Sequence, residues 1–174
     1  SLMAPNRLGA LINPYHEGME QEIKDQLLPG VYDLPFQKLP EEKPRPFYFL
    51  DPASVLVARA LDAQPGEKIL DLCAAPGGKS LVLAYEMEGK GELVVNDLSR
   101  DRRFRLRRVI DEYLPNDFPI RMTGHDAGSW CLYETKAYDK ILLDAPCSSE
   151  RHLLQKGLKD WKIGRTKRLA KEQW

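Results

Sequence analysis

Short apolar runs alternate with helix-like segments through the middle of this chain, and this alternation limits the fold more than any other feature. Four runs have the length and composition of strands, and they cover residues 68–74, 92–97, 120–124 and 138–144. Helices are predicted between them, from about Lys79 to Met87 and from the capping residue Ser99 to about Tyr113. Strands that alternate with helices favour an α/β fold with a doubly wound, mostly parallel sheet.

The residues before the first of these runs show a different sequence pattern. Asp51-Pro52 is typical of a helix start, and Pro65-Gly66 is expected to end that helix. Seven of the 13 prolines fall within residues 3–46, where only one helix is predicted, over about 17–28, stopped by Pro29-Gly30. We therefore predict a tag remnant at residues 1–2, an N-terminal arm with one short helix over residues 3–50, and one domain over residues 51–174.

The charge total conceals its distribution. Lys and Arg number 26 and Asp and Glu also number 26, yet residues 100–108 hold six arginines and one aspartate, and residues 151–174 hold eight basic and two acidic side chains. Clustered cations neutralise phosphates whatever the total charge, so a nucleic-acid partner is not excluded. The alternative is that both blocks are solvated helix faces.

The composition disfavours a membrane-spanning protein and a disulfide-rich secreted protein. No apolar run is long enough to cross a bilayer, so no membrane partner is expected. The three cysteines include no C-x-x-C pair and cannot form a disulfide framework. This cysteine usage favours a reducing compartment and a cytoplasmic location.

A glycine-containing loop follows the first predicted strand, at the sheet edge where open α/β sheets bind ligands. The loop Cys73–Lys79 has small residues and two glycines, which let a ligand approach the backbone closely. The next helix start supplies free N–H donors for a carboxylate or phosphate. Asp97 ends the second strand, 20 residues beyond Gly77, a spacing that suits a carboxylate binding a ribose diol.

The loop matches neither G-x-G-x-x-G nor the P-loop pattern, which disfavours a nicotinamide cofactor and an NTPase. Acidic residues stand at or just beyond the strand ends, at Asp71, Asp97, Asp126 and Asp144. Singly, each is typical of a loop or capping residue. Together they favour a cationic ligand that carries hydroxyls, such as S-adenosylmethionine with its sulfonium, ammonium and ribose diol.

Cys147 follows Pro146 on the loop after the fourth predicted strand, which puts it at the same edge. A thiolate is a good nucleophile when its pKa is lowered. Cys73 and Cys131 are also consistent with the ordinary role of cysteine as a small buried hydrophobe.

Residues 51–168 resemble the Nop/Sun RNA cytosine-5 methyltransferases. The resemblance is carried by Ile69–Ser80 (ILDLCAAPGGKS), by Asn96–Ser99 with Arg102, by Asp126 and by Asp144–Cys147 (DAPC). It implies a Rossmann-like class I methyltransferase fold that uses S-adenosylmethionine, and no metal, to methylate carbon 5 of cytosine in rRNA or tRNA. The residues after Cys147 are most similar to a branch with mitochondrial enzymes, so a mitochondrial location is the alternative for a eukaryotic chain.

The resemblance also implies roles for single residues. Cys147 is implied to assist product release. The implied cofactor-binding residues are Asp71, Cys73, Ala74, Ala75, Pro76, Gly77, Gly78, Lys79, Asp97, Arg102, Asp126 and Asp144. The implied RNA-facing or solvent-facing residues are Arg103, Arg105, Arg107 and Arg108, and Phe104 is expected either to stack on a base or to join the core.

The family's nucleophile lies in a later Thr-Cys motif, which this sequence does not contain. We therefore expect a methyltransferase sheet truncated after its fourth strand. Three alternatives remain: a fragment of a longer enzyme, a module that binds cofactor and RNA without catalysis, or an enzyme in which Cys147 is itself the nucleophile. A small-molecule methyltransferase is a further alternative function.

Overall fold

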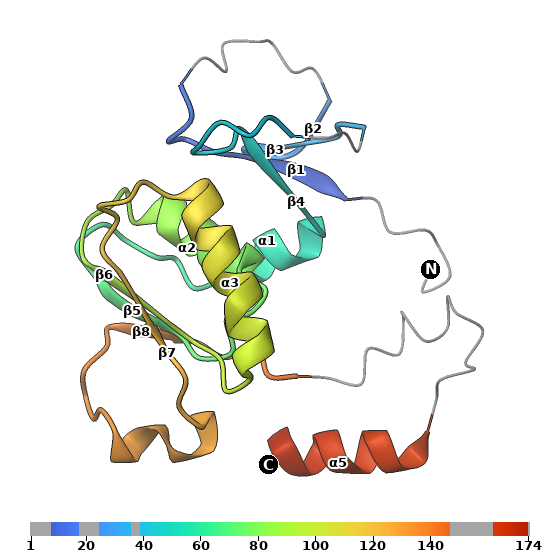
Figure 1. Cartoon of the computed structure of the whole chain (residues 1–174), viewed down its shortest axis with the longest axis vertical. Helices are drawn as coiled ribbons and strands as arrows, with labels where there is room; N and C mark the ends of the chain where they lie inside the picture. The colour runs from blue at the N-terminus through green and yellow to red at the C-terminus, as the bar shows by residue number, and fades with distance from the viewer. Residues whose placement is uncertain (1–7, 18–24, 36–38, 147–161, 174) are drawn as a thin grey trace. The chain divides into compact units, whose positions relative to one another are not determined.

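The computed structural model describes residues 8–17, 25–35, 39–146 and 162–173. The chain divides into two compact units, of which the larger, here called the main unit, covers residues 8–143 (Figure 1). The described part of the second unit comprises residues 144–146 and the helix α5 (Ile163–Gln173) with the residue before it. Among the described helices, none is long and apolar enough to cross a membrane.

The central sheet of the main unit is parallel, as the alternating pattern predicts. Its strands are β5 (Lys68–Asp71), β6 (Glu92–Asn96), β7 (Ile120–Thr123) and β8 (Lys140–Leu142). They lie in the order β7-β6-β5-β8, and each neighbouring pair is parallel. The α/β fold class is therefore confirmed. Because parallel strands end at one edge, Asp71 and the residues after β6 and β7 come together there.

Three helices connect and flank these strands, namely α1 (Pro52–Arg59), α2 (Gly78–Glu86) and α3 (Arg100–Tyr113). Both predicted caps are present: Asp51 accepts a hydrogen bond from the Ala53 amide, and Ser99 accepts one from the Arg102 amide. The expectation that α1 continues to Pro65 is wrong. The backbone enters the left-handed region at Asp62 (φ 55°), which a helix cannot accommodate.

The two faces of the central sheet are covered differently because successive residues of a strand point to opposite sides. One face packs against the helices in a large core that includes Ile69, Leu93 and Leu106, each fully buried. Burial of each such side chain contributes roughly 1.5–3 kcal/mol relative to leaving it exposed. The other face forms a smaller cluster in which Leu70 and Val94 pack with Trp130 of the 3-10 helix η1 (Ala127–Leu132).

An antiparallel sheet precedes the parallel one. Its strands are β1 (Gly9–Ile12), β2 (Gln26–Leu28), β3 (Val31–Tyr32) and β4 (Phe47–Leu50), in the order β2-β3-β1-β4. The predicted helix over 17–28 is wrong at residues 26–28, and residues 18–24 lie outside the described part. Pro29-Gly30, expected to stop a helix, instead forms the turn of a hairpin, with Gly30 at φ +68°. The predicted domain boundary at residue 50 stays a prediction.

We call the edge of the parallel sheet that carries Asp71 and Asp97 the acidic edge. A polar network, here called the Arg121 cluster, lies at the opposite edge, at the starts of β5 and β6. Arg121 contacts Glu92 at 3.1 Å and Glu134 at 2.7 Å, and Lys68 contacts Glu92 at 2.9 Å. Tyr138 donates to Glu134 at 2.6 Å, and this hydrogen bond is the main cause that lowers the pKa of Glu134. Burial, followed by the Glu134 contact, raises the pKa of Tyr138 to about 12.

Candidate functional site

The first acidic strand end is fixed inside the protein. Asp71, the last residue of β5, is 1% exposed, and the Ser80 hydroxyl of α2 donates to its Oδ2 atom at 2.7 Å. A buried carboxylate is stable only when hydrogen-bond donors or cations surround it. This contact joins β5 to α2 across the glycine-containing loop, so the loop is held at both of its ends.

The two glycines of the loop are required by geometry. Gly77 lies in the left-handed region at φ +118°, and a Cβ atom there would stand 3.0 Å from Val109 and 3.1 Å from Leu106 of α3. A Cβ atom at Gly78 would stand 3.1 Å from the Tyr48 ring of β4. Gly77 also provides no capping side chain for α2, so the first turn of that helix offers amide groups to an anionic ligand.

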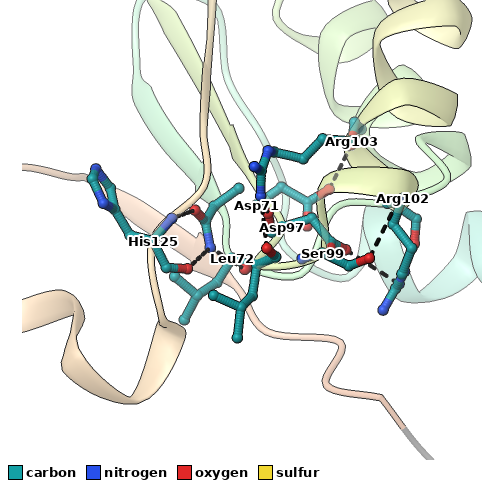
Figure 2. Close-up of polar contacts among 11 residues, drawn as sticks. Asp71, Leu72, Asp97, Ser99, Arg102, Arg103 and His125 are labelled. Carbon is teal, nitrogen blue, oxygen red and sulfur yellow. Dashed lines mark hydrogen bonds and ion pairs between the residues drawn. The ribbon is translucent and has the colours of Figure 1, made fainter.

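Asp97, directly after β6, is 4% exposed and only partly satisfied. Its Oδ1 atom accepts from the Ser99 amide at 3.0 Å, whereas its buried Oδ2 atom accepts no hydrogen bond within the described residues. Arg102 Nη2 forms an ion pair with Oδ2 at 3.3 Å and also donates to the Ala75 carbonyl at 2.5 Å (Figure 2). Arg102 thus connects Asp97 to the glycine-containing loop, as the prediction of a shared site requires.

Asn96 was given no role in the sequence analysis, yet its side chain forms hydrogen bonds to several segments at this edge. It is 1% exposed, and its Nδ2 atom donates to the carbonyls of Leu72 and His125, both at 3.0 Å. Its Oδ1 atom accepts from the Thr123 hydroxyl at 2.9 Å and from the His125 amide at 2.8 Å. One side chain therefore joins the ends of β5, β6 and β7. A polar residue at the end of an apolar strand, directly before Asp97, was the available sequence signal.

Arg103 also has a role that the sequence did not reveal. Its Nη1 atom donates to the carbonyls of Asp97 at 2.6 Å and Leu98 at 2.7 Å (Figure 2). Its guanidinium lies over Gly124, where a Cβ atom would stand 2.6 Å from Arg103 Cζ. The expectation that Arg103 faces solvent or RNA is therefore wrong, because this side chain fastens the loop after β6 against the loop after β7.

The structure says less about the other residues that were predicted to form the site. Asp126 caps η1 by accepting from the Gly128 amide at 3.0 Å and is exposed, and its contact with adenine stays a prediction. Asp144 is exposed and belongs to the second unit, and Cys147 lies outside the described residues. Among the residues that the structure describes, no group of histidine, cysteine and acidic side chains is arranged to hold a metal ion.

The assembled edge suits a ligand with hydroxyls and a carboxylate. The Asp97 Oδ2 atom, which forms an ion pair with Arg102 but accepts no hydrogen bond within the described residues, can accept hydrogen bonds from a diol, and the start of α2 can donate to an anion. Carboxylates also suit a cationic ligand group. The geometry therefore matches the ligand class expected from the sequence.

Comparisons with known proteins point to one family. The model of a family described as 16S rRNA methyltransferase RsmB/F matches residues 58–169. A 5-cytosine rRNA methyltransferase NSUN4 from Xenopus laevis is 45% identical over 112 residues, which are 62% of this chain and 27% of that protein. The chain thus spans about a quarter of the length of this curated relative.

Two solved structures share the fold. One is of a methyltransferase homolog protein from Pyrococcus horikoshii, with a TM-score of 0.69 and 23% identity over 84% of this chain and 52% of that one. The other is of NSun6 from Pyrococcus horikoshii with SFG, with a TM-score of 0.54 and 35% identity over 58% of this chain and 26% of that one. Both likenesses agree with the observed parallel sheet.

Proposed function

Because the chain belongs to the 16S rRNA methyltransferase RsmB/F family, we propose that it takes part in methyl transfer from S-adenosylmethionine to carbon 5 of cytosine in RNA. Family membership confirms the resemblance seen at Asp71–Lys79 and Asp144–Cys147. The observation that carries the proposal is the buried Asp97 carboxylate beside the glycine-containing loop and the start of α2. Its Oδ2 atom is paired with Arg102 and accepts no hydrogen bond among the residues that the structure describes.

The residues of the acidic edge fit S-adenosylmethionine group by group. Asp97 accepts hydrogen bonds from the ribose hydroxyls, with Arg102 holding its carboxylate in place. The loop from Cys73 to Lys79 and the start of α2 receive the methionine carboxylate. We assign Asp126 to the adenine. When bound, the cofactor supplies a methyl group activated by its sulfonium.

The substrate half of the proposal rests on Cys147 and on RNA. Carbon 5 of cytosine is a poor nucleophile until a thiolate adds to carbon 6, which is why cysteines serve this chemistry. We assign Cys147 to product release, by analogy with the family's Pro-Cys motif. The target base must leave its stack, at a cost of a few kcal/mol in a duplex, so a cytosine in single-stranded or loop RNA is the favoured substrate.

Calorimetric titration of S-adenosylmethionine tests the cofactor half. Asp97→Asn removes one carboxylate acceptor and is expected to weaken binding by about 10- to 100-fold, the equivalent of one hydrogen bond to a charged group. Asp101→Asn, an exposed change on α3, is the matched control and leaves affinity unchanged. Absence of binding by the unaltered chain, or equal affinities for both variants, would refute the assigned site.

Transfer of a labelled methyl group to cytosine-containing RNA tests the substrate half. Binding of cofactor and RNA without transfer supports the alternative of a module without catalysis. The sequence holds no Thr-Cys motif, so methyl transfer and a covalent RNA adduct that this chain forms and that Cys147→Ala abolishes would identify Cys147 as the nucleophile and refute its assignment to product release. Methylation of free metabolites but not RNA supports the small-molecule alternative.

A further inference from the structure

The outward side of α3 combines one exposed aromatic ring with several arginines. Phe104 is 62% exposed, and the Arg100 guanidinium stands 5.6 Å from the centre of its ring, one helical turn away. Arg107 and Arg108 follow one turn further along the helix, and Arg105 lies beside them. All of these arginines are exposed. We call Arg100, Phe104, Arg105, Arg107 and Arg108 the α3 face.

The arginines of α3 divide into two groups by their partners. Arg102 and Arg103 turn toward the acidic edge, where they bind carbonyls and the Asp97 carboxylate. Arg108 contacts Glu112 at 2.9 Å. Within the described residues, Arg105 and Arg107 make no recorded hydrogen bond or ion pair, so their charges are available to a partner.

The acidic side chains of this helix do not cancel its charge. Asp101 and Asp111 are exposed near its two ends, and Glu112 is taken up by Arg108 and Arg45. Residues 100–112 thus carry six arginines against three carboxylates. Without the inward-turned Arg102 and Arg103, four arginines remain against these three carboxylates, so the side of α3 that carries Phe104 keeps an excess of one cation. The Phe104 ring itself is exposed and is not part of the core.

We propose that the α3 face is a docking surface for single-stranded RNA, with a base stacked on Phe104 and phosphates bound by Arg105 and Arg107. The inference rests on the proposed function, since it concerns the same substrate class, and adds a surface distinct from the cofactor-binding edge. An exposed aromatic ring offers its π-face to any base, and guanidinium groups bind phosphates with directed hydrogen bonds.

The isolation of Phe104 distinguishes RNA from a protein partner. A protein interface is centred on a continuous apolar patch, whereas Phe104 is surrounded by cations on its own helix face. Arginines around a single ring are the pattern of nucleic-acid surfaces that combine stacking with phosphate contacts. Charge complementarity therefore favours a polyanion that carries bases able to stack, which is single-stranded RNA.

Fluorescence anisotropy with a labelled, cytosine-containing single-stranded RNA measures the contribution of the ring. Phe104→Ala is expected to raise the RNA dissociation constant by roughly 5- to 150-fold, the range for loss of one base–aromatic stack. Phe104→Trp keeps a stacking surface and binds RNA at least as tightly as the unaltered chain. Leu132→Ala on η1 removes another exposed apolar side chain, 80% exposed, and leaves RNA affinity unchanged.

The salt dependence of the same binding tests the arginines. The double variant Arg105→Gln with Arg107→Gln is expected to flatten the slope of log affinity against log salt by about 0.7 for each lost phosphate contact. Lys90→Gln removes one exposed cation of the loop before β6 and serves as the matched charge control. An unchanged slope in the double variant would show that these arginines do not bind phosphate.

The outcomes separate this surface from the proposed function. If the unaltered chain binds no RNA, both the RNA function and the α3 face are refuted. If Phe104→Ala keeps circular dichroism, cofactor affinity and RNA affinity, only the α3 face is refuted. A change in self-association on sedimentation of Phe104→Ala, with RNA affinity unchanged, likewise refutes the RNA assignment and identifies the face as a protein contact.

Discussion

Replacement of Asn96 by alanine tests whether one buried amide holds the carboxyl edge of the parallel sheet together. The wild-type side chain makes four hydrogen bonds, two as donor and two as acceptor, to groups after β5 and in and after β7. A neutral hydrogen bond contributes about 1 kcal/mol net. The four bonds therefore predict that Asn96→Ala lowers the free energy of unfolding by about 4 kcal/mol, a large part of the roughly 5–15 kcal/mol of a typical domain.

Urea unfolding followed by circular dichroism measures this loss directly. Thr123→Val is the matched variant, because it removes only the hydroxyl that donates to Asn96 Oδ1 at 2.9 Å and keeps the volume of the side chain similar. We expect it to cost about 1 kcal/mol. Asn96→Asp keeps the shape but loses both donors and directs a carboxylate at the carbonyls of Leu72 and His125, so it is expected to destabilise strongly at neutral pH.

The reasoning is refuted if Asn96→Ala and Thr123→Val lower the free energy of unfolding by the same amount. That result would mean that the other three hydrogen bonds of Asn96 contribute no net stability. A loss of about 4 kcal/mol in Asn96→Ala, with an unchanged urea dependence, supports a direct loss of native contacts.

Three further predictions follow from neighbouring contacts. Gly124→Ala displaces the flexible end of Arg103 rather than backbone, so we expect little loss of stability but about 10-fold weaker S-adenosylmethionine binding by calorimetry, the equivalent of one charged hydrogen bond. Ser80→Ala removes a buried donor to a carboxylate and is expected to cost roughly 1.5–3 kcal/mol in urea unfolding. Glu134→Gln removes a carboxylate of the Arg121 cluster, and the pKa of this carboxylate is lowered below 4.5. The loss of stability in this variant is therefore expected to be largest at neutral pH and to shrink as the pH falls through the lowered pKa. Unfolding at several pH values measures this dependence.

Each of these changes has a control in the same chain. Gly164→Ala in α5 places a Cβ atom where no other atom lies within 4 Å, and it is expected to leave cofactor affinity unchanged. Equal affinities for the two alanine variants would refute the role of Arg103. Ser54→Ala in α1 controls for helix propensity at Ser80, and equal costs would contradict the buried hydrogen bond. A cost of Glu134→Gln that does not vary with pH would rule out the ionised carboxylate as its source.

Local sequence pattern predicted the parallel strands and most of the helix starts because their causes are local. Apolar runs favour buried strands, and the side chains of Asp51 and Ser99 satisfy amides two or three residues ahead. The same local reasoning failed at residues 26–28. Pairing with Val31 and Tyr32 across the Gly30 turn makes these residues a strand, and such pairing is not visible in helical periodicity.

The acidic residues and glycines of the candidate site were also visible in the sequence, since each stands at or near a strand end. The contacts that these residues make could not be seen in the sequence. Asp97 was expected from its spacing to Gly77, but the buried Oδ2 atom without a donor is known only from the packed structure. Asp126 was grouped with Asp97, and the structure shows it capping η1.

The sequence by itself determined the fold class, the family and the set of ligand-binding candidates, because these depend on residue order and on short motifs. Only the tertiary structure decided which arginines of α3 turn toward the acidic edge and which turn outward. Arg102 and Arg103 turn inward because β6 and β7 bring carbonyls, a carboxylate and Gly124 beneath the first turn of the helix. Phe104 and the arginines around it turn outward because the helix period places them opposite Leu106 and Ile110, which enter the core.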